Sequence, residues 1–226
     1  MTTVTLAGST GLVGSHILQT LLTQPSISNI HAFTRKPLPS STKLTPITGS
    51  PDTWASSFPQ STLFISALGT TRGAAGGLAN QRKIDHDLPV SLATASIDKG
   101  AQVAVLISSA SANDKSSFAY MKMKGETETA FTNLPFKHVV FVRPGLIVGD
   151  RNESRPAEAV MRTIASCLGS VGNALKDPWA QDASVIARAA VRAGQMCLDG
   201  KVKKKVWVLD QKDIVRLGRT EWSENA

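Results

Sequence analysis

The most restrictive feature of this chain is the alternation of short apolar runs with longer segments of helical period. Seven runs, rich in Val and Ile and bounded by Gly, Pro or Ser, are typical of strands: TVTLAG, NIHAFT, KLTPIT, TLFISAL, QVAVLIS, KHVVFVRPG and KVWVLD. After the first run, one helix face is traced by Val13, Ile17, Leu18, Leu21 and Leu22. Strands that alternate with helices favour a parallel sheet covered by helices on both faces.

One segment, from about residue 150 to residue 200, departs from this alternation. It reads as mostly helical, with interruptions at RPAE, LGSVGN and KDPW. We expect it to form a small helical C-terminal cap over the carboxyl edge of the sheet. A chain of 226 residues can bury one good core but is short for two full domains. We therefore expect a single domain over residues 1–226.

Composition argues against a membrane-spanning or secreted protein. Hydrophobic residues make up 42% of the chain and charged residues 19%, which is ordinary for a globular protein. The sequence contains no run of about eighteen uncharged apolar residues, so no spanning helix is expected. The first predicted strand begins at Thr3, and we therefore expect no cleavable leader and a cytoplasmic location.

The net charge of +8 raises the question of a nucleic-acid partner. The cations are dispersed apart from KVKKK at positions 201–205, and only 5% of residues are aromatic. No nucleic acid is therefore expected, since a stacking platform is missing. Attraction of an anionic cofactor or an acidic membrane surface explains the charge as well.

Cys167, Cys197 and four scattered histidines lack the spacing of metal ligands, so no metal site is expected.

The segment GSTGLVG, at positions 8–14, lies between the first predicted strand and the first predicted helix. In that place Gly8 permits a tight turn, Gly11 lets the backbone approach a pyrophosphate, and Gly14 lets the helix pack closely on the strand. The helix start near Gly11 would offer free N–H groups and a positive dipole end to phosphates. A ligand-free turn is the other interpretation, but the strand-to-helix context favours a dinucleotide site.

Two cations, Arg35 and Lys36, follow the second predicted strand, where an NAD-binding protein would carry an acid for the ribose hydroxyls. No Asp or Glu occurs between Met1 and Pro51. A solvated basic loop is the alternative interpretation. The position favours contact with the 2′-phosphate of NADPH.

The segment YMKMK places Tyr120 and Lys124 four residues apart on a predicted helix, hence on one face. A neighbouring ammonium favours the phenolate, so we expect Lys124 to lower the pKa of Tyr120 and make it a proton donor to a carbonyl oxygen. Upstream, VLISSAS ends the fifth predicted strand with hydroxyls, of which Ser109 is our candidate to hold the substrate oxygen. Alone, a Tyr and a Lys at this spacing occur often by chance. The glycine turn and the basic loop strengthen the assignment.

Several longer segments make the resemblance to a known family specific. They are GSTGLVG, TRK, ALGTTRG, SSASANDKSSFAYMKMKGETE and FVRPGLIVGDRNESRP, which together span nearly the whole chain. The sequence resembles the atypical short-chain dehydrogenases/reductases, and among them the Tat-interactive-protein family and its fungal mitochondrial oxidoreductase-like relatives. The ALGTTRG and DRNESRP segments are the more specific ones, because generic short-chain reductases lack both.

The resemblance implies an α/β fold of Rossmann type, with a doubly wound parallel sheet that binds NADPH. It makes Tyr120 the active-site tyrosine and Lys124 the residue that holds the nicotinamide ribose. Many relatives carry an acid after the third strand, where this chain has Thr48 and Gly49. The implied cofactor contacts are Thr10, Gly11, Leu12, Val13, Arg35, Lys36, Leu68, Gly69, Tyr120, Lys124, Ile147 and Arg155.

Two functional classes follow from these observations. One is an NADPH-dependent carbonyl reductase acting on a small aldehyde, ketone or quinone, with a pocket lined by Met161, Ile164, Cys167, Leu168 and Trp179. The other is a non-catalytic NADPH-binding redox sensor or interaction protein. The intact Tyr, Lys and Ser set favours the enzyme, although the fold alone names no substrate. Fungal relatives are associated with mitochondria, which adds a peripheral place at the mitochondrial outer membrane to the cytoplasm as an expected location.

Overall fold

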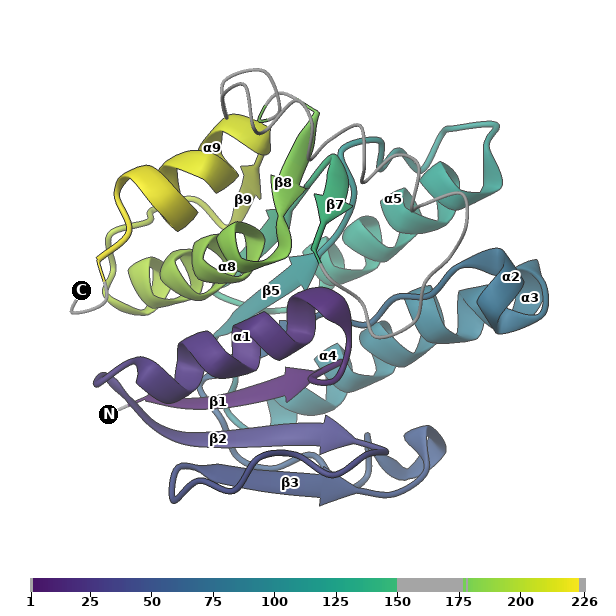
Figure 1. Ribbon diagram of the computed structural model, residues 1–226. Helices are drawn as coiled ribbons and strands as arrows, with labels where there is room; N and C mark the ends of the chain where they lie inside the picture. Colours follow the sequence, from purple (N-terminus) through teal and green to yellow (C-terminus); the bar gives the residue numbers. More distant parts are fainter. Residues whose placement is uncertain (1, 150–176, 178, 224–226) are drawn as a thin grey trace.

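The computed structural model, shown in Figure 1, describes residues 2–149, 177 and 179–223. Its centre is a seven-stranded sheet in the order β3-β2-β1-β4-β5-β6-β9, in which every pair of neighbours is parallel. Each strand overlaps one predicted run: β1 (Thr2–Ala7), β2 (Ile27–Thr34), β3 (Leu44–Thr48), β4 (Leu63–Ser66), β5 (Val103–Ile107), β6 (His138–Val142) and β9 (Val206–Leu209). The predicted α/β, Rossmann-type parallel sheet is confirmed.

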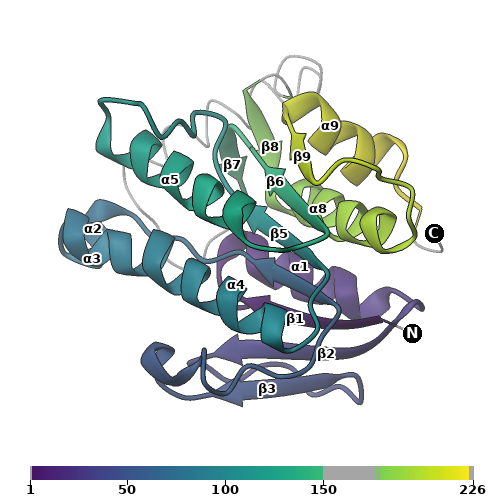
Figure 2. The same cartoon turned by 180° about the vertical axis from the view of Figure 1, so that it is seen from behind.

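In the part of the chain that the structure describes, four long helices cover the two faces of the sheet. Helices α1 (Leu12–Thr23) and α8 (Ala183–Leu198) lie side by side on one face. Helices α4 (Leu88–Asp98) and α5 (Ala119–Asn133) cover the other, as Figure 2 shows from behind. Alternate strand residues point to opposite faces, so the sheet separates two cores. The α1–α8 side is mostly aliphatic, whereas the α4–α5 side holds aromatic rings, with Phe33 stacked on Trp54 at 5.2 Å between ring centroids.

Shorter elements complete the described chain. The strands β7 (Leu146–Val148) and β8 (Ala180–Asp182) form a separate parallel pair that the sequence patterns did not predict. The remaining elements are α2 (Arg72–Ala75), α3 (Leu78–Arg82), a π-helical turn Lys83–Asp87, a 3₁₀ turn Pro51–Thr53, α9 (Gln211–Val215) and a π-helical turn Arg216–Thr220.

Helix α8 corrects the expected extent of the cap. The predicted cap covered residues 150–200, but Ala183–Leu198 belongs to the helix layer on the sheet. Small residues explain its place: a Cβ on Gly194 would stand 2.9 Å from Leu63 Cδ2, so the helix backbone approaches the sheet closely. The preceding strand β8 has three residues, too few to show an apolar run. Residues 150–176 and 178 of the predicted cap lie outside the described residues.

The sheet order places a switch point next to the first strand. From β1 the chain proceeds through α1 to β2 and β3 on one side, then returns to β4 on the other side of β1. The helices that follow β1 and β4 thus leave the carboxyl edge in opposite directions. In open parallel sheets, ligands bind in the crevice at such a point. The predicted glycine turn occupies this position.

Candidate functional site

The turn between β1 and α1 depends on glycines for its shape. Gly8 has φ +88°, and a Cβ there would stand 2.6 Å from the carbonyl oxygen of Ala67. A Cβ on Gly14 would stand 1.9 Å from the carbonyl oxygen of Gly8. The first position therefore requires a left-handed backbone beside β4, and the second lets α1 press directly on the turn.

The chain that leads into α1 is exposed, and the first turn of the helix is mostly buried. Gly11 is the N-cap residue and, having no side chain, makes no capping hydrogen bond to the first turn of the helix. Thr10 and Gly11 are exposed, whereas Val13 is buried in the core and offers only its backbone to a ligand. Leu12 is half-buried beside the end of β7, since a Cβ on Gly149 would stand 3.1 Å from its Cδ1. Uncapped N–H groups with the positive end of the helix dipole form a suitable place for an anion.

The cations Arg35 and Lys36 directly follow β2 and are both exposed. The Thr34 hydroxyl holds their turn, because it donates to the Lys36 carbonyl at 2.6 Å and accepts from the Lys36 N–H at 3.0 Å. Ser9 ties the glycine turn to the same strand end, since its hydroxyl donates to the Phe33 carbonyl at 3.1 Å. No carboxylate in the described ranges forms an ion pair with either cation. The backbone that carries the two cations is thus held at the same strand end as the glycine turn.

The loop after β4 contains the predicted contacts Leu68 and Gly69. Leu68 is half-buried and packs on the aromatic core, and Gly69 is exposed. The next residue, Thr70, donates its N–H to Asp85 Oδ1 at 2.7 Å. Ile147, in β7, is half-buried against the aliphatic core. Arg155 lies outside the described residues, as do Met161, Ile164, Cys167 and Leu168 of the predicted pocket.

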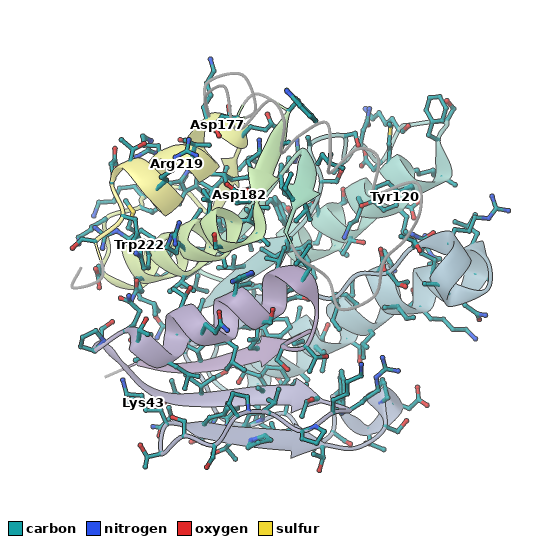
Figure 3. The ribbon with its side chains drawn as sticks, viewed as in Figure 1. Lys43, Tyr120, Asp177, Asp182, Arg219 and Trp222 are labelled. Atoms are coloured by element: carbon teal, nitrogen blue, oxygen red, sulfur yellow. The ribbon has the colours of Figure 1, made fainter. Side chains whose placement is uncertain are left out.

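The predicted catalytic residues come together at the carboxyl ends of β5 and the start of α5. Tyr120 projects from the first turn of α5, as Figure 3 shows, and is 41% exposed; the Ser109 side chain lies close enough to lower its pKa. Lys124, one turn further along, is 4% exposed and donates to the Ile107 carbonyl at 3.4 Å. A helix of ordinary pitch brings Tyr120 and Lys124 to one face, and the end of β5 brings Ser109 and the Ile107 carbonyl to the same cluster.

The pKa of Tyr120 differs from the expectation. Burial of its hydroxyl raises the pKa, the negative charge of Asp85 raises it further, and the Ser109 hydrogen bond lowers it. The predicted lowering by Lys124 is wrong for the protein without ligand. Burial lowers the pKa of the Lys124 ammonium, which Asp85 and Glu128 counteract. The Lys124 ammonium thus faces two carboxylates, Asp85 and Glu128, whose negative charges favour its protonated form.

A second group of buried polar side chains supports α5 and was missed by the sequence analysis. Glu128, which is 5% exposed, accepts from Ser108 at 2.5 Å and from Arg143 Nε at 3.0 Å. The hydrogen bond to Glu128 raises the pKa of Arg143. A single Glu on a helix and an Arg after a strand have no recognisable spacing, so only the fold reveals that they meet.

These residues fit a dinucleotide with a nicotinamide ribose at Lys124. The buried ammonium has three donors but, among the described residues, a single acceptor at 3.4 Å, so ribose hydroxyls would complete its hydrogen bonds. The open end of α1 would receive the pyrophosphate, and the cations after β2 a phosphate on the other ribose. After β3, where many relatives carry an acid, this chain has Gly49. Its carbonyl accepts a hydrogen bond from the Trp54 indole at 3.2 Å.

Curated proteins of fungi match this chain over nearly its full length. Protein fmp52, mitochondrial, of Aspergillus fumigatus is 51% identical over 233 residues, which cover 96% of this chain and 99% of that protein. Protein fmp-52, mitochondrial, of Neurospora crassa is 44% identical over 236 residues, covering 99% and 98%. The chain belongs to the fungal Fmp52 family. The part of the resemblance that points to fungal mitochondrial relatives is thereby confirmed. No protein-family model matches the chain.

Solved structures share the fold of this Fmp52 family member at low sequence identity. MoeE5 in complex with UDP-glucose and NAD has a TM-score of 0.67 at 17% identity, covering 96% of this chain and 81% of that chain. UDP-glucuronic acid 4-epimerase from Bacillus cereus in complex with NAD has a TM-score of 0.64 at 16% identity, covering 92% and 76%. Such likeness shows the Rossmann-type fold. In the described part of the chain, no helix has the length and apolar character needed to cross a membrane.

Proposed function

We propose that this protein is an NADPH-dependent oxidoreductase of the short-chain dehydrogenase/reductase type that reduces a carbonyl group. The observation that carries the proposal is the cluster of Ser109, Tyr120 and buried Lys124 at the same sheet edge as the glycine turn. Structural neighbours solved with NAD have the same fold, which supports a nicotinamide cofactor.

Each residue of the cluster has a distinct part in this reaction. NADPH, when bound, supplies the hydride that the carbonyl carbon receives. The Tyr120 hydroxyl donates a proton to the carbonyl oxygen, and Ser109 holds that oxygen by a hydrogen bond. The ordinary pKa of tyrosine is about 10, and burial raises the pKa of Tyr120 further, so the hydroxyl is protonated at neutral pH. A protonated tyrosine is the form that a reduction requires. Lys124 holds the nicotinamide ribose.

The choice of NADPH rests on Arg35 and Lys36. A carboxylate at the end of β2 would accept ribose hydroxyls, whereas two cations suit a dianionic 2′-phosphate. The Thr34 hydroxyl fixes their turn in advance. Ordering of the turn is therefore not required upon binding, which favours affinity.

The proposal also includes a substrate class and a location in the cell. An apolar or aromatic aldehyde, ketone or quinone fits the residues predicted to line the pocket. The relatives are named mitochondrial, which supports a peripheral position at the mitochondrial outer membrane beside the cytoplasmic one. A wider relation to the Tat-interactive-protein group is part of the same proposal.

The decisive experiment compares wild type with Tyr120→Phe. The change removes one hydroxyl, so NADPH affinity measured by fluorescence should stay within about twofold, while turnover falls roughly 10²- to 10⁴-fold. The substrate comes from a screen of aldehydes, ketones and quinones that follows NADPH consumption. Equal turnover by Tyr120→Phe would contradict the catalytic assignment. Tight NADPH binding with no reduction of any carbonyl would favour the redox-sensor alternative.

A further inference from the structure

A buried carboxylate, Asp85, lies beside the proposed active site without a part in the mechanism above. It belongs to the π-helical turn Lys83–Asp87 and is 1% exposed. Burial raises its pKa, against the positive charge of Lys124 and the Thr70 N–H, which lower it. A buried charge costs stability unless its partners compensate. The presence of a buried carboxylate at this position therefore has to be explained.

The contacts of Asp85 connect two parts of the site. Its Oδ1 accepts from the Thr70 N–H at 2.7 Å, which anchors the loop that carries Leu68 and Gly69. Its main-chain carbonyl accepts from the Thr127 hydroxyl on α5 at 3.3 Å. Asp85 thus links the cofactor side of the site to the helix that carries Tyr120.

The charge of Asp85 acts on both functional groups of α5. It attracts the Lys124 ammonium and disfavours the phenolate of Tyr120. No close ion pair forms between Asp85 and Lys124 in the described structure, so the attraction acts across a gap. The other charged groups that face the cluster are Glu128 and its partner Arg143.

A purely structural part would not require a carboxylate. An asparagine has nearly the same shape, and its amide oxygen could accept the Thr70 N–H equally well. It would also avoid the cost of a buried charge. The hydrogen bond to Thr70 therefore does not explain why the residue is charged. The groups on which the charge acts are the proposed proton donor, Tyr120, and the proposed ribose-binding residue, Lys124.

We propose that Asp85 is a positioning residue of this site, whose buried carboxylate anchors the loop after β4 and places a negative charge beside Gly69 and the Lys124 side chain. This inference rests on the proposed function of Tyr120 as a proton donor. It assigns two separable effects to one side chain. Asp85→Asn removes the charge and keeps the acceptor, whereas Asp85→Ala removes both.

Tyr120 is the single tyrosine of the chain, so its ionisation can be followed without cofactor or substrate. Tyrosinate absorbance in a pH titration should show a lower pKa for Tyr120 in Asp85→Asn than in wild type. Asp87→Asn is the matched control, since Asp87 is on the same turn but its side chain is 53% exposed. An unchanged or higher pKa in Asp85→Asn, or an equal shift in Asp87→Asn, would overturn the proposal.

Steady-state kinetics then separates charge from anchor. For Asp85→Asn, the loss of kcat at high pH should begin at lower pH, because the donor form of Tyr120 is lost as pH rises through its pKa. For Asp85→Ala, KM for NADPH should also rise about tenfold, because the Thr70 N–H loses its acceptor. If kcat of Asp85→Asn falls at the same high pH as kcat of wild type, the effect of the Asp85 charge on Tyr120 is refuted. If no substrate is turned over, the proposed function fails, and the tyrosine titration still decides whether Asp85 controls Tyr120.

Discussion

The glycine turn and the cluster around Tyr120 lie at the same edge of the sheet, yet they are built in opposite ways. The turn consists of backbone and depends on the absence of side chains at Gly8 and Gly14. The cluster consists of buried charges from two elements, in which Asp85 of the turn Lys83–Asp87 and Glu128 of α5 both act on Lys124. Substitutions in the glycine turn should therefore be tolerated or not according to the volume that they add. Substitutions in the cluster around Tyr120 should be tolerated or not according to the charge that they change.

The sharpest test of the turn is Gly14→Ala. Alanine favours helix over glycine by about 1 kcal/mol, so any loss must come from the clash of Cβ with the Gly8 carbonyl at 1.9 Å. We expect the free energy of unfolding to fall by about 3 kcal/mol or more, a decrease in Tm of roughly 6–12 °C. Differential scanning calorimetry measures the change in Tm. Gly11→Ala is the control, because its Cβ would stand at 3.4 Å from the same oxygen. Equal stability of both variants would disprove steric control of the turn.

The cations beside the turn should affect binding and leave the fold unchanged. Arg35→Ala with Lys36→Ala removes two charge-assisted contacts to the 2′-phosphate, which should weaken NADPH binding by about 2 to 4 kcal/mol, or roughly 30- to 1,000-fold. Titration calorimetry with NADPH and NADH measures the preference. Lys203→Ala with Lys205→Ala removes the same charge before β9, at the amino edge of the sheet. A similar loss in that control, or a wild-type preference for NADH, would contradict the assignment.

The smallest expected effect concerns the stability of the charged cluster. Because burial raises the pKa of Asp85, its protonated form favours folding, and that stability is lost as pH rises through the raised pKa. Asp85→Asn escapes this loss, so its Tm at neutral pH should exceed that of wild type by up to about 4 °C. The difference should vanish below about pH 3.9, the ordinary pKa of Asp. Calorimetry at both pH values tests this, and a lower Tm at neutral pH would show that the charge stabilises the fold.

The two regions also differ in how far the sequence predicts them. Glycines between a strand and a helix fix the turn locally, and helical spacing brings Tyr120 to Lys124. These relations depend on neighbours along the chain, and the structure reproduces them. Asp85 meets the same cluster from a turn some forty residues away, and no local pattern marks it. The direction of the Tyr120 pKa was mispredicted because neither the burial of its hydroxyl nor the charge of Asp85 could be seen in the sequence.

The extent of the cap was mispredicted for a related reason. A helix rich in alanine fits a cap and a sheet layer equally well in sequence. Its place is decided by contacts far along the chain, such as the Gln195 amide that donates to Ser26 at 2.8 Å. The prediction of β4, β5 and β6 succeeded because buried parallel strands are nearly continuous apolar runs.

The pairing of α8 with α1 has a consequence for the order of folding during synthesis. The Gln195 and Gln24 side chains meet across a separation of 171 residues, so α1 leaves the ribosome long before its neighbour. Until α8 is complete, the apolar side of α1 that it covers stays accessible to other chains. We expect nascent chains that end before Ala183 to aggregate or to bind chaperones. The first segment of the fold to be made is thus among the last to be fully enclosed.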